Sequence, residues 1–369
     1  MITPEEKLHI IKMGLADIIG IEKLEKKILS GENLKVYWGT CPTGPIHLGY
    51  LVSLVKIAHL VLADCEVTIL LADLHAHLDS VKTSWELLEL RTQYYERAIK
   101  QILLRMQVDI TKIKFVKGSE FQLTTKYTID VYKLMSKMTL KETQEGIGDI
   151  IDQSTNPVLS GLIYPVLQIL DEVYLGVGCE LGGLDQKKIF MMGCRNLNKI
   201  GHESNIYLIN NVVPNLLTKN SKNPLDVSTK MSSSGEPESR IDITDDSQTI
   251  YKKINLIDKG NCDVLFSYLR NIVFPIIELS NMNNYLGPIN TSERIDQIRF
   301  NVMVDCSYGD YMGLESYANF EELKLGYQKD IINLHDLKSA LSKWIVSFLM
   351  EIKKYFSSDE MVGLLARCY

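Results

Sequence analysis

Short apolar runs alternate with longer stretches of helical periodicity through most of the N-terminal part of the chain. The short runs have period 2 or are continuous, which predicts β-strands, whereas apolar residues three or four positions apart predict helices. Strands that alternate with helices are typical of a parallel, doubly wound sheet, so we expect an α/β fold of the Rossmann-like kind. The predicted strands are Leu34–Gly39, Glu66–Ala72, Ile113–Lys117, Lys188–Met192 and Ile206–Asn210, and the predicted helices are Thr3–Ser30, Leu48–Leu62, Ser84–Met106, Thr124–Met138 and Pro165–Leu175.

The pattern changes after a polar loop that contains Gly and Pro. Beyond this loop the chain has mostly helical periodicity, apart from an irregular stretch near Asn281–Arg294. In Leu334–Phe356 the apolar residues recur at i, i+4 and i+7, which predicts a helix packed on a core. We therefore predict an α/β domain over residues 1–236 and a mostly helical domain over residues 237–369. A polar insertion is predicted at Lys219–Asp226.

Length, charge and cysteine content limit the class of protein. The chain has 369 residues, which is enough for two domains with separate cores. A formal net charge of −6 and a pI of about 5.7 give no indication of a nucleic-acid partner, so any such partner must bind a local basic patch. The seven cysteines are scattered, with no Cys-x-x-Cys pair, which favours a reducing compartment and argues against a zinc site.

No targeting or membrane segment is predicted. The first residues, Met1–Lys7, lack the apolar core of a secretory signal and the Arg-rich pattern of a transit peptide, so we expect a cytoplasmic protein. The longest apolar stretch, Leu48–Leu78, is interrupted by Lys56, Asp64 and Asp73. A membrane span needs about 20 predominantly apolar residues, so we expect no membrane partner.

Two segments far apart in the chain have the residue types that handle phosphate. Residues Tyr37–Tyr50 predict a strand, a tight Pro/Gly turn and a helix whose first turn contains His47. Such a turn directs an imidazole and free backbone N–H groups at a bound anion. Lys230–Ser234 places a lysine in a hydroxyl-rich loop. Alone, this second segment is more typical of an ordinary Ser-rich surface loop, and only the pair in this order indicates a nucleotide site.

A stripe of polar residues on one predicted helix indicates a pocket. Tyr164, Gln168 and Asp171 are spaced i, i+4 and i+7, so one face presents a phenol, an amide and a carboxylate in line. The alternatives are a solvated polar face, or a helix carboxylate that caps the helix or pairs with a cation. The neighbouring residues Leu162–Leu170 are too apolar for an exposed helix, which favours the pocket. Its groups suit a zwitterionic amino acid with a phenolic side chain.

Two histidines follow a predicted strand, at the sheet edge where open α/β sheets bind ligands. His75 and His77 stand at i and i+2, a spacing that also suits a metal ion. No cysteine or third ligand lies nearby in the sequence, so we predict no metal site. We expect His75 to line the pocket and His77 to lie outside it.

Four segments together resemble the signatures of a known family. His47-Leu48-Gly49-Tyr50 resembles His-Ile-Gly-His, and Lys230-Met231-Ser232-Ser233-Ser234 resembles Lys-Met-Ser-Lys-Ser, the two signatures of class I aminoacyl-tRNA synthetases. Tyr164-Pro165-Val166-Leu167-Gln168-Ile169-Leu170-Asp171 and Gly182-Gly183-Leu184-Asp185-Gln186 narrow the resemblance to tyrosyl-tRNA synthetases of the archaeal and eukaryotic type. The resemblance covers nearly the whole chain.

The resemblance implies an enzyme that activates L-tyrosine with ATP and transfers it to the terminal adenosine of tRNA(Tyr). Its catalytic residues would be His47 at the phosphates and Lys230 at the leaving pyrophosphate. ATP would carry Mg²⁺ as a co-substrate, with no metal held by the protein itself. The implied tyrosine-binding residues are Tyr37 and Asp171 at the phenolic oxygen, Tyr164, Gln168 and Gln186 at the α-amino group, and His75 in the pocket; the implied ATP-binding residues are Gly39, Gly44, His47, Gly49, Lys230, Met231, Ser232 and Ser233.

The same resemblance assigns tRNA contacts. In the C-terminal domain, Tyr311 and Asp336 match the family positions that stack on and hydrogen-bond the first anticodon base. Asn333 stands where a histidine usually completes that stack. Glu145 and Lys187 stand where basic residues, often arginine, face the acceptor end of the tRNA.

The chain departs from both signatures. Tyr50 replaces the second histidine of the first signature, and Ser233 replaces the second lysine of the other. Eukaryotic-type members of the family resemble this chain in both respects, so we interpret these residues as marks of a subtype. The resemblance also implies a homodimer, with its interface around Tyr132–Pro157.

Two other functions compete with this interpretation. A tryptophanyl-tRNA synthetase would have the same fold, but Asp171 and Tyr37 suit a phenol better than an indole. A non-catalytic RNA-binding relative would keep the fold without needing His47 and Lys230, both of which are present. A dinucleotide enzyme is not indicated, because Gly176–Leu181 lacks the third glycine of the phosphate-binding loop.

Overall fold

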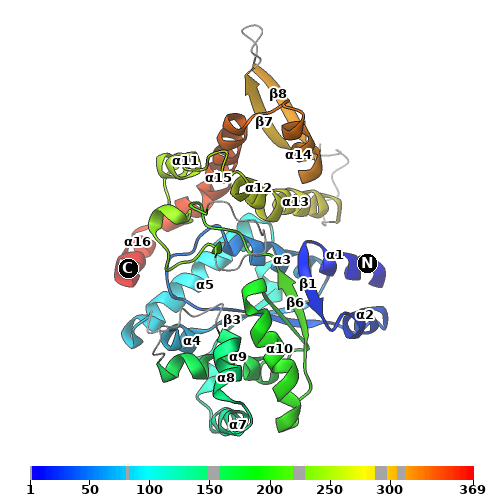
Figure 1. Cartoon of the computed structure of the whole chain (residues 1–369), viewed down its shortest axis with the longest axis vertical. Coiled ribbons are helices and arrows are strands. Elements are labelled where there is room, and N and C mark those ends of the chain that lie inside the picture. Colours follow the sequence, from blue (N-terminus) through cyan, green and yellow to red (C-terminus); the bar gives the residue numbers. More distant parts are fainter. Residues whose placement is uncertain (1, 80–82, 148–157, 219–228, 287–296, 306–311) are drawn as a thin grey trace.

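The computed structural model describes residues 2–79, 83–147, 158–218, 229–286, 297–305 and 312–369. Figure 1 shows an elongated molecule, with a large sheet and its helices in one half and the C-terminal helices and a β-hairpin in the other. No helix within these ranges is long and apolar enough to cross a membrane. The insertion predicted at Lys219–Asp226 lies outside these ranges.

The large sheet has six strands in the order β1-β6-β5-β2-β3-β4. Neighbouring strands run parallel, except that β1 at one edge is antiparallel to β6. The predicted α/β fold with a doubly wound parallel sheet is therefore confirmed, with one antiparallel edge strand added. The strands are β1 (Leu15–Ile19), β2 (Lys35–Thr40), β3 (Glu66–Leu71), β4 (Ile113–Lys117), β5 (Cys179–Gly183) and β6 (Ile206–Asn210).

Helices cover both faces of the sheet (Figure 1). On β2, Val36 and Trp38 pack on one face in the largest buried cluster, together with α3 and α5. Tyr37 points to the opposite face, because successive residues of a strand alternate between the two sides. The helices of this half are α1 (Pro4–Lys12), α2 (Ile21–Leu29), α3 (Tyr50–Leu62), α4 (Asp73–Leu78), α5 (Leu88–Arg105), α6 (Ser119–Gln122), α7 (Thr125–Met135), α8 (Leu140–Ile147), α9 (Leu159–Tyr174) and α10 (Lys187–Asn196).

Two predicted strand assignments need correction. Lys188–Met192 is not a strand but part of α10, in which Ile189, Phe190, Met192 and Gly193 are buried. A short apolar run fits either structure, and here burial continues at helical spacing to Asn196. The strand β5 was not predicted at all, because its sequence Cys-Glu-Leu-Gly-Gly has two glycines and an acid, which are rare in strands.

Two predicted helices also differ from the structure. The single helix predicted at Thr3–Ser30 is interrupted by β1, which lies between Gly14 (φ 67°) and Gly20 (φ 82°). Left-handed backbone at these glycines ends one helix and begins the next. The helix predicted to start at Pro165 starts instead at Leu159, so that Pro165 lies inside α9.

The C-terminal half is mostly helical, as predicted, but it also contains a two-stranded antiparallel sheet. Figure 1 shows this hairpin projecting from the end of the molecule. The stretch predicted to be irregular is helical up to Leu286, and residues 287–296 are outside the described part. The elements are α11 (Ser247–Asn255), α12 (Asp263–Tyr268), the π-helix η7 (Leu269–Val273), α13 (Phe274–Leu286), β7 (Phe300–Asp305), β8 (Met312–Tyr317), α14 (Phe320–Gln328), α15 (Leu334–Phe356) and α16 (Asp359–Cys368).

The segment that follows the second signature, Lys230–Ser234, forms backbone hydrogen bonds with the first signature. The Leu48 N–H donates to the Ile241 carbonyl at 2.9 Å, and the Ile243 N–H donates to the Ile46 carbonyl at 3.0 Å. One buried cluster also extends from the N-terminal helices to the C-terminal helices. The predicted boundary near residue 237 therefore stays a prediction, since both sides of it pack on the same core.

Candidate active site

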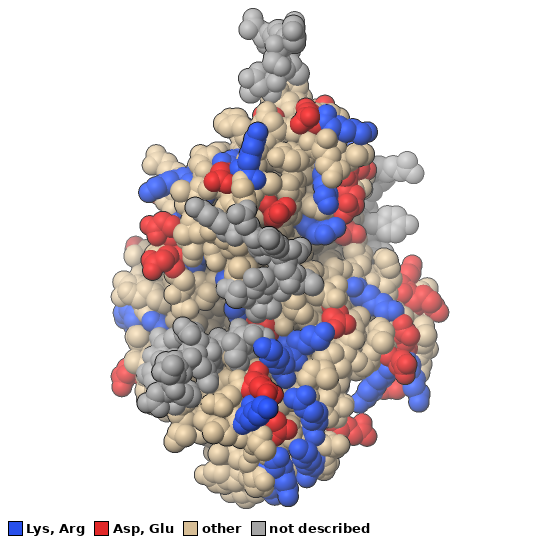
Figure 2. All heavy atoms as spheres, in the orientation of Figure 1, with Lys and Arg blue, Asp and Glu red and all other residues tan. Residues whose placement is uncertain are grey.

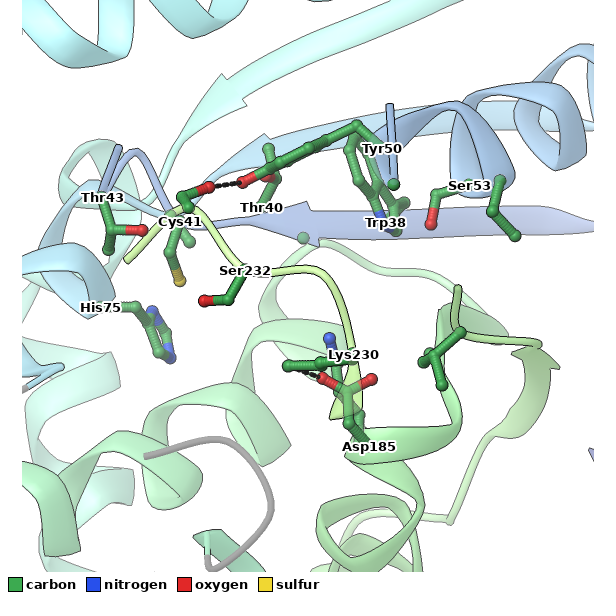
Figure 3. A pocket seen from close by; sticks show the side chains of 18 of the residues that line it. Trp38, Thr40, Cys41, Thr43, Tyr50, Ser53, His75, Asp185, Lys230 and Ser232 are labelled. Carbon is green, nitrogen blue, oxygen red and sulfur yellow. Dashed lines mark hydrogen bonds and ion pairs between the residues drawn. The ribbon is translucent and has the colours of Figure 1, made fainter. Parts of the chain in front are cut away.

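A cavity of about 240 Å³ lies at the carboxyl ends of β2, β3 and β5. This is the edge at which open α/β sheets bind ligands. Figure 3 shows Lys230 and Asp185 on one side of the cavity and Thr40, Cys41 and Tyr50 on the other. The ionisable and amide side chains of its wall come from both signatures, α4 and the residue after it, α9, β5, and the turns after β5 and β6: Tyr37, Cys41, His47, Tyr50, His75, Asp79, Tyr164, Gln168, Asp171, Glu180, Asp185, Gln186, Asn211 and Lys230.

His47 lies in the turn between β2 and α3, and only 5% of its surface is exposed. The backbone N–H of Gly49 donates to its Nδ1 at 3.2 Å, so a neutral ring carries its proton on Nε2. Burial, with smaller effects from the charges of Arg240 and Lys230, lowers the pKa of His47 to about 3. The imidazole is therefore neutral at ordinary pH and keeps one N–H to donate to an anion.

The two signature segments contact each other. A Cβ at Gly44 would lie 2.8 Å from the Cβ of Ser233, which is closer than side chains approach, so this turn requires a glycine. The Tyr50 hydroxyl lies 3.3 Å from the Ser233 hydroxyl and 3.0 Å from the Tyr95 hydroxyl. Tyr95 in turn donates to the Gly44 carbonyl at 2.8 Å. The two residues at which the chain departs from the family signatures are thus partners.

Lys230 is paired with Asp185, as Figure 3 shows. The lysine extends from the second signature into the cavity, and the aspartate belongs to the Gly182–Gln186 segment after β5. Burial opposes the charge of Lys230, yet the neighbouring Asp185 carboxylate raises the pKa of this amine above its ordinary value. The ammonium is therefore present, and Asp185 neutralises its charge.

Asp171 lies at the inner end of the cavity, with 1% of its surface exposed. Its Oδ1 accepts hydrogen bonds from Gln122 Nε2 and from the Tyr127 hydroxyl, each at 2.7 Å. Its Oδ2 faces His75 Nε2 at 3.8 Å. Burial raises the pKa of Asp171 to about 8, although both hydrogen bonds lower it. One carboxyl oxygen is thus fixed and the other is open to a ligand.

Other polar atoms near Asp171 lack partners. The Tyr37 hydroxyl and His75 Nε2 are buried without a hydrogen-bond partner among the described residues. Burial, followed by the neighbouring Glu180 carboxyl, raises the pKa of Tyr37, and burial lowers the pKa of His75 to about 4. Buried polar groups are rarely left unpaired, so these two atoms indicate a polar ligand group. Within the described residues, no group of three or more His, Cys, Asp or Glu side chains could hold a metal ion.

A second polar group lies beside β5. Gln168 Nε2 donates to Gln186 Oε1 at 2.8 Å and to Glu180 Oε1 at 3.0 Å. The Tyr164 hydroxyl lies 3.2 Å from the Cys41 sulfur, and its ring meets the His75 ring edge-on at 4.6 Å between centroids. The cavity thus has one polar end at Asp171 and another at Gln168, as a substrate with two polar ends requires.

Comparison with known proteins assigns this chain to a family. The model of the family tRNA synthetases class I (W and Y) matches residues 29–297. The chain belongs to this family. It is 38% identical to the cytoplasmic tyrosine–tRNA ligase of Danio rerio over its whole length, but it spans only 64% of that relative. The cytoplasmic tyrosine–tRNA ligase of Saccharomyces cerevisiae is 35% identical, with 97% of this chain and 86% of the relative covered.

A solved structure of the same kind has the same architecture. The tyrosyl-tRNA synthetase of Archaeoglobus fulgidus, solved with L-tyrosine, is 27% identical and superposes with a TM-score of 0.76. The superposition covers 95% of this chain and 98% of the other. The resemblance to class I synthetases of the archaeal and eukaryotic tyrosyl type is therefore confirmed.

The structure brings together nearly all of the tyrosine and ATP residues that the family resemblance implies. Gly44 is the exception, because it lies beside Ser233 rather than on the cavity wall. The roles of these residues stay predictions. The predicted residues that line the cavity are Tyr37, Gly39, His47, Gly49, His75, Tyr164, Gln168, Asp171, Gln186, Lys230, Met231, Ser232 and Ser233.

The predicted tRNA residues are elsewhere. Tyr311 lies outside the described residues. Asp336 is in the C-terminal half at the start of α15, where its carboxylate accepts the Asn333 N–H at 3.1 Å. The Asn333 side chain accepts the Asp336 N–H in return, so the pair forms a capping box. The predicted role of Asp336 in RNA binding stays a prediction, beside a structural role that the sequence did not indicate.

Sequence analysis missed four residues that shape the site. Gln122 and Tyr127 hold Asp171, Glu180 holds Gln168, and Asp185 holds Lys230. Asp185 lies in the Gly182–Gln186 segment, which resembles the family, but the resemblance implied no role for this side chain. The others lie in segments without a signature, and Glu180 is on the strand that was not predicted.

Proposed function

We propose that this chain is a tyrosine–tRNA ligase. It activates L-tyrosine with ATP to tyrosyl-adenylate and transfers the tyrosyl group to the 3′ terminal adenosine of tRNA(Tyr). Family membership and the names of the relatives support this function, and one observation carries it. The buried carboxyl of Asp171 has one oxygen open beside the unpaired Tyr37 hydroxyl and His75 Nε2, which suits a phenol better than an indole or a phenyl ring.

The proposed substrate fits the two polar ends of the cavity. The phenolic hydroxyl of tyrosine would hydrogen-bond Asp171 Oδ2, and the Tyr37 hydroxyl would pair with the phenolic oxygen. The α-ammonium group would reach Gln168, Gln186 and Tyr164. A substrate without the hydroxyl would leave these buried groups unpaired, which is how such a site rejects phenylalanine; the known discrimination of this enzyme family is the standard example of the effect.

Activation needs no protein nucleophile. A carboxylate oxygen of tyrosine bonds to the α-phosphorus of ATP, the bond from that phosphorus to the bridging oxygen breaks, and pyrophosphate leaves with the electron pair. His47, neutral and with Nε2–H free to donate, would contact the phosphates. Lys230 would leave Asp185 and meet the charge that develops on pyrophosphate, so its effect would be largest in the transition state. Mg²⁺ would arrive with ATP as part of the substrate and neutralise phosphate charge.

A local basic surface supports an RNA partner. Figure 2 shows Lys and Arg side chains gathered over the part of the molecule where α10 lies in Figure 1. Lys188, Arg195 and Lys199 are exposed there on α10 and the turn after it. Such a patch binds phosphate even when the whole chain is acidic. Anticodon contacts by Tyr311 and Asp336 belong to the same proposal.

An exposed apolar surface supports a homodimer. Along α7, α8 and the start of α9, the side chains of Tyr132, Leu140 and Leu159 are 65%, 60% and 76% exposed. Contiguous exposed apolar side chains mark interaction sites. They flank the predicted interface around Tyr132–Pro157, of which residues 148–157 are outside the described part.

The cytoplasmic location is proposed with the function, because the relatives named above are cytoplasmic enzymes.

Tyrosine-dependent exchange of pyrophosphate into ATP tests the function. We expect exchange with tyrosine and far slower exchange with tryptophan or phenylalanine. Faster exchange with tryptophan would identify the other specificity of this family. No exchange with any amino acid by well-folded protein would reject the enzyme and favour a non-catalytic RNA-binding relative.

A further inference from the structure

Glu180 is a buried acid in the wall of the cavity. Only 2% of its surface is exposed, and it lies on β5 directly beside Tyr37 of β2 in the parallel register. Its side chain lines the same cavity as Gln168. Acidic side chains are almost never fully buried without a partner, and they are rare within strands. No role in the activation step above uses this residue.

The partner of Glu180 is the side-chain amide of Gln168. Both N–H groups of Gln168 Nε2 are engaged, one by Glu180 Oε1 at 3.0 Å and the other by Gln186 Oε1 at 2.8 Å. Within the described residues, no donor reaches Gln168 Oε1. Gln168 therefore presents only its carbonyl oxygen to a ligand. That oxygen can accept from an ammonium group, whereas the NH₂ group could not.

The orientation of this amide needs an anchor. The oxygen and nitrogen of a glutamine amide are nearly equal in size, so packing alone does not select between them. Gln186 has the same ambiguity and can turn together with Gln168. The carboxyl of Glu180 has no N–H group, and its unprotonated oxygen can only accept. Glu180 therefore selects one orientation of the Gln168 and Gln186 amides, the one in which Gln168 Nε2 faces the carboxyl.

We propose that Glu180 is a positioning residue that directs the Gln168 carbonyl oxygen at the α-ammonium group of the amino-acid substrate. This inference rests on the proposed function, since it concerns the same substrate. Burial, with the neighbouring Glu172 carboxyl, raises the pKa of Glu180 well above its ordinary value. A protonated Glu180 still offers one accepting oxygen to Gln168, whereas a glutamine at this position would add a third amide with the same ambiguity.

Binding measurements with three ligands test the inference. L-tyrosine and tyramine carry the ammonium group, whereas 3-(4-hydroxyphenyl)propanoate lacks it and keeps the phenol and carboxylate. Glu180→Leu removes the acceptor, so we expect the Kd of tyrosine and of tyramine to rise about tenfold, the effect of one hydrogen bond, while the Kd of the propanoate changes less than about twofold. Glu180→Gln keeps an accepting oxygen but its amide can also turn, so we expect a tyrosine affinity between that of Glu180→Leu and that of the parent.

Glu172 provides a matched control. It is the next residue along α9 from Asp171, 1% exposed and hydrogen-bonded to Asn205 and Tyr207, but it does not line the cavity. Glu172→Leu also buries an apolar group in place of an acid, so we expect it to affect the melting temperature without discriminating between the three ligands. If Glu180→Leu does not fold, Glu180→Met removes the same acceptor with an unbranched side chain of similar length.

Three results would overturn the inference. These are parent-like tyrosine affinity in the folded Glu180→Leu or Glu180→Met protein, equal weakening of all three ligands, and a Glu180→Gln protein as weak as Glu180→Leu. A parent protein that binds none of the ligands would instead reject the proposed function, and this inference with it. If the parent protein binds tyrosine and Glu180→Leu binds it with the same affinity, this inference alone is rejected.

Discussion

The Tyr50 hydroxyl lies 3.3 Å from the Ser233 hydroxyl, so the two residues at which this chain departs from the class I signatures contact each other. One residue belongs to the first signature and the other to the second. Tyr95 extends the contact to the backbone of Gly44. Tyr50 and Ser233 therefore join the two segments that would enclose ATP. This contact is consistent with a subtype of the family rather than with lost activity.

We expect Tyr50→Phe and Ser233→Ala to be non-additive. Either change breaks the contact between the signatures, so the second change should cost little once the first is made. The measurement is a double-mutant cycle on kcat/KM for ATP in pyrophosphate exchange. We expect a coupling free energy of about 0.5–1.5 kcal/mol, the size of one hydrogen bond. Strict additivity would mean that the contact does not stabilise the active arrangement.

Lys230→Ala should slow activation far more than it weakens tyrosine binding. The ammonium is paired with Asp185 and has no part in the proposed binding of the amino acid. Its charge is needed only when pyrophosphate leaves, so we expect kcat to fall by at least about 10²-fold with the Kd of tyrosine nearly unchanged. Pre-steady-state formation of the adenylate and equilibrium binding of tyrosine give the two numbers.

Lys12→Ala is the control for this change. Lys12 also forms an ion pair, with Glu25 at 2.6 Å, but it lies on α1 away from the cavity. We expect parent rates from it. Equal losses of rate and tyrosine affinity in Lys230→Ala would instead indicate that the lysine holds the pocket together.

The parts of the site that sequence analysis found are those with local patterns. Tyr164, Gln168 and Asp171 are recognisable because a helix repeats every three to four residues, and His47 because a strand, turn and helix follow one another directly. The polar atoms that hold these residues come from elsewhere in the chain. Gln122 and Tyr127 reach Asp171 from α6 and α7, more than forty positions away, which no local spacing predicts.

The errors in the fold have a similar cause. The β5 strand has a weak strand sequence and is kept by its two parallel neighbours, β2 and β6. The apolar run at Lys188–Met192 fits a strand or a helix, and only its packing beside α8 and α9 selects the helix. Tertiary contacts decide such segments, so their sequences alone do not.

Asp336→Ala should reduce aminoacylation of tRNA and leave tyrosine-dependent pyrophosphate exchange near the parent rate. The residue lies in the C-terminal half, far along the chain from every residue of the cavity. Because Asp336 is the N3 residue of a capping box, its loss removes the hydrogen bond from the Asn333 N–H and costs about 0.5–1.5 kcal/mol of helix stability. A loss of exchange together with a lower melting temperature would show that the residue is only structural.

Asp246→Ala controls for the lost cap. Asp246 caps α11 in the same half of the molecule, where its carboxylate accepts the Thr249 N–H at 2.7 Å. We expect this variant to lose stability of the same order without losing aminoacylation. Similar aminoacylation by both variants would remove the support for an anticodon role of Asp336.

The contribution of Asp171 to the stability of the protein should fall as the pH rises from about 4 to about 8. Burial raises the pKa of Asp171 to about 8, so between its unfolded and folded pKa values folding takes up a proton. Its contribution is fully present below the unfolded value and is lost as the pH passes the folded value. A single such group gives a slope of at most about 1.4 kcal/mol per pH unit.

Asp171→Asn isolates this contribution from that of the neighbouring buried acids. Asparagine can accept from Gln122 and Tyr127 with its oxygen but does not titrate. We expect its melting temperature, relative to the parent, to rise between pH 5 and pH 8 and then to level off. Parallel melting curves over this range would show that Asp171 is ionised in the folded protein.

Asp171→Ala should remove much of the preference for tyrosine over phenylalanine. The change deletes the partner of the substrate phenol and the short acceptor of the Gln122 N–H, at a cost of roughly 1–3 kcal/mol for an unsatisfied buried group, whereas the Tyr127 hydroxyl still donates to the Leu167 carbonyl at 2.9 Å. Phenylalanine makes no hydrogen bond at this end, so its kcat/KM should fall much less. The measurement is the ratio of kcat/KM for the two amino acids in pyrophosphate exchange, together with a thermal melt.

Two further variants distinguish a loss of phenol recognition from a loss of stability. Asp130→Ala removes a buried acid that accepts the Tyr174 hydroxyl at 2.7 Å but does not line the cavity, so it should lose stability and keep the parent ratio. Tyr127→Phe keeps the carboxyl of Asp171 and removes one of the two hydrogen bonds to its Oδ1, so we expect a smaller loss of preference than in Asp171→Ala. If folded Asp171→Ala protein keeps the parent ratio of kcat/KM for tyrosine and phenylalanine, another group recognises the phenol. The argument for tyrosine over other aromatic substrates would then lose its physical basis.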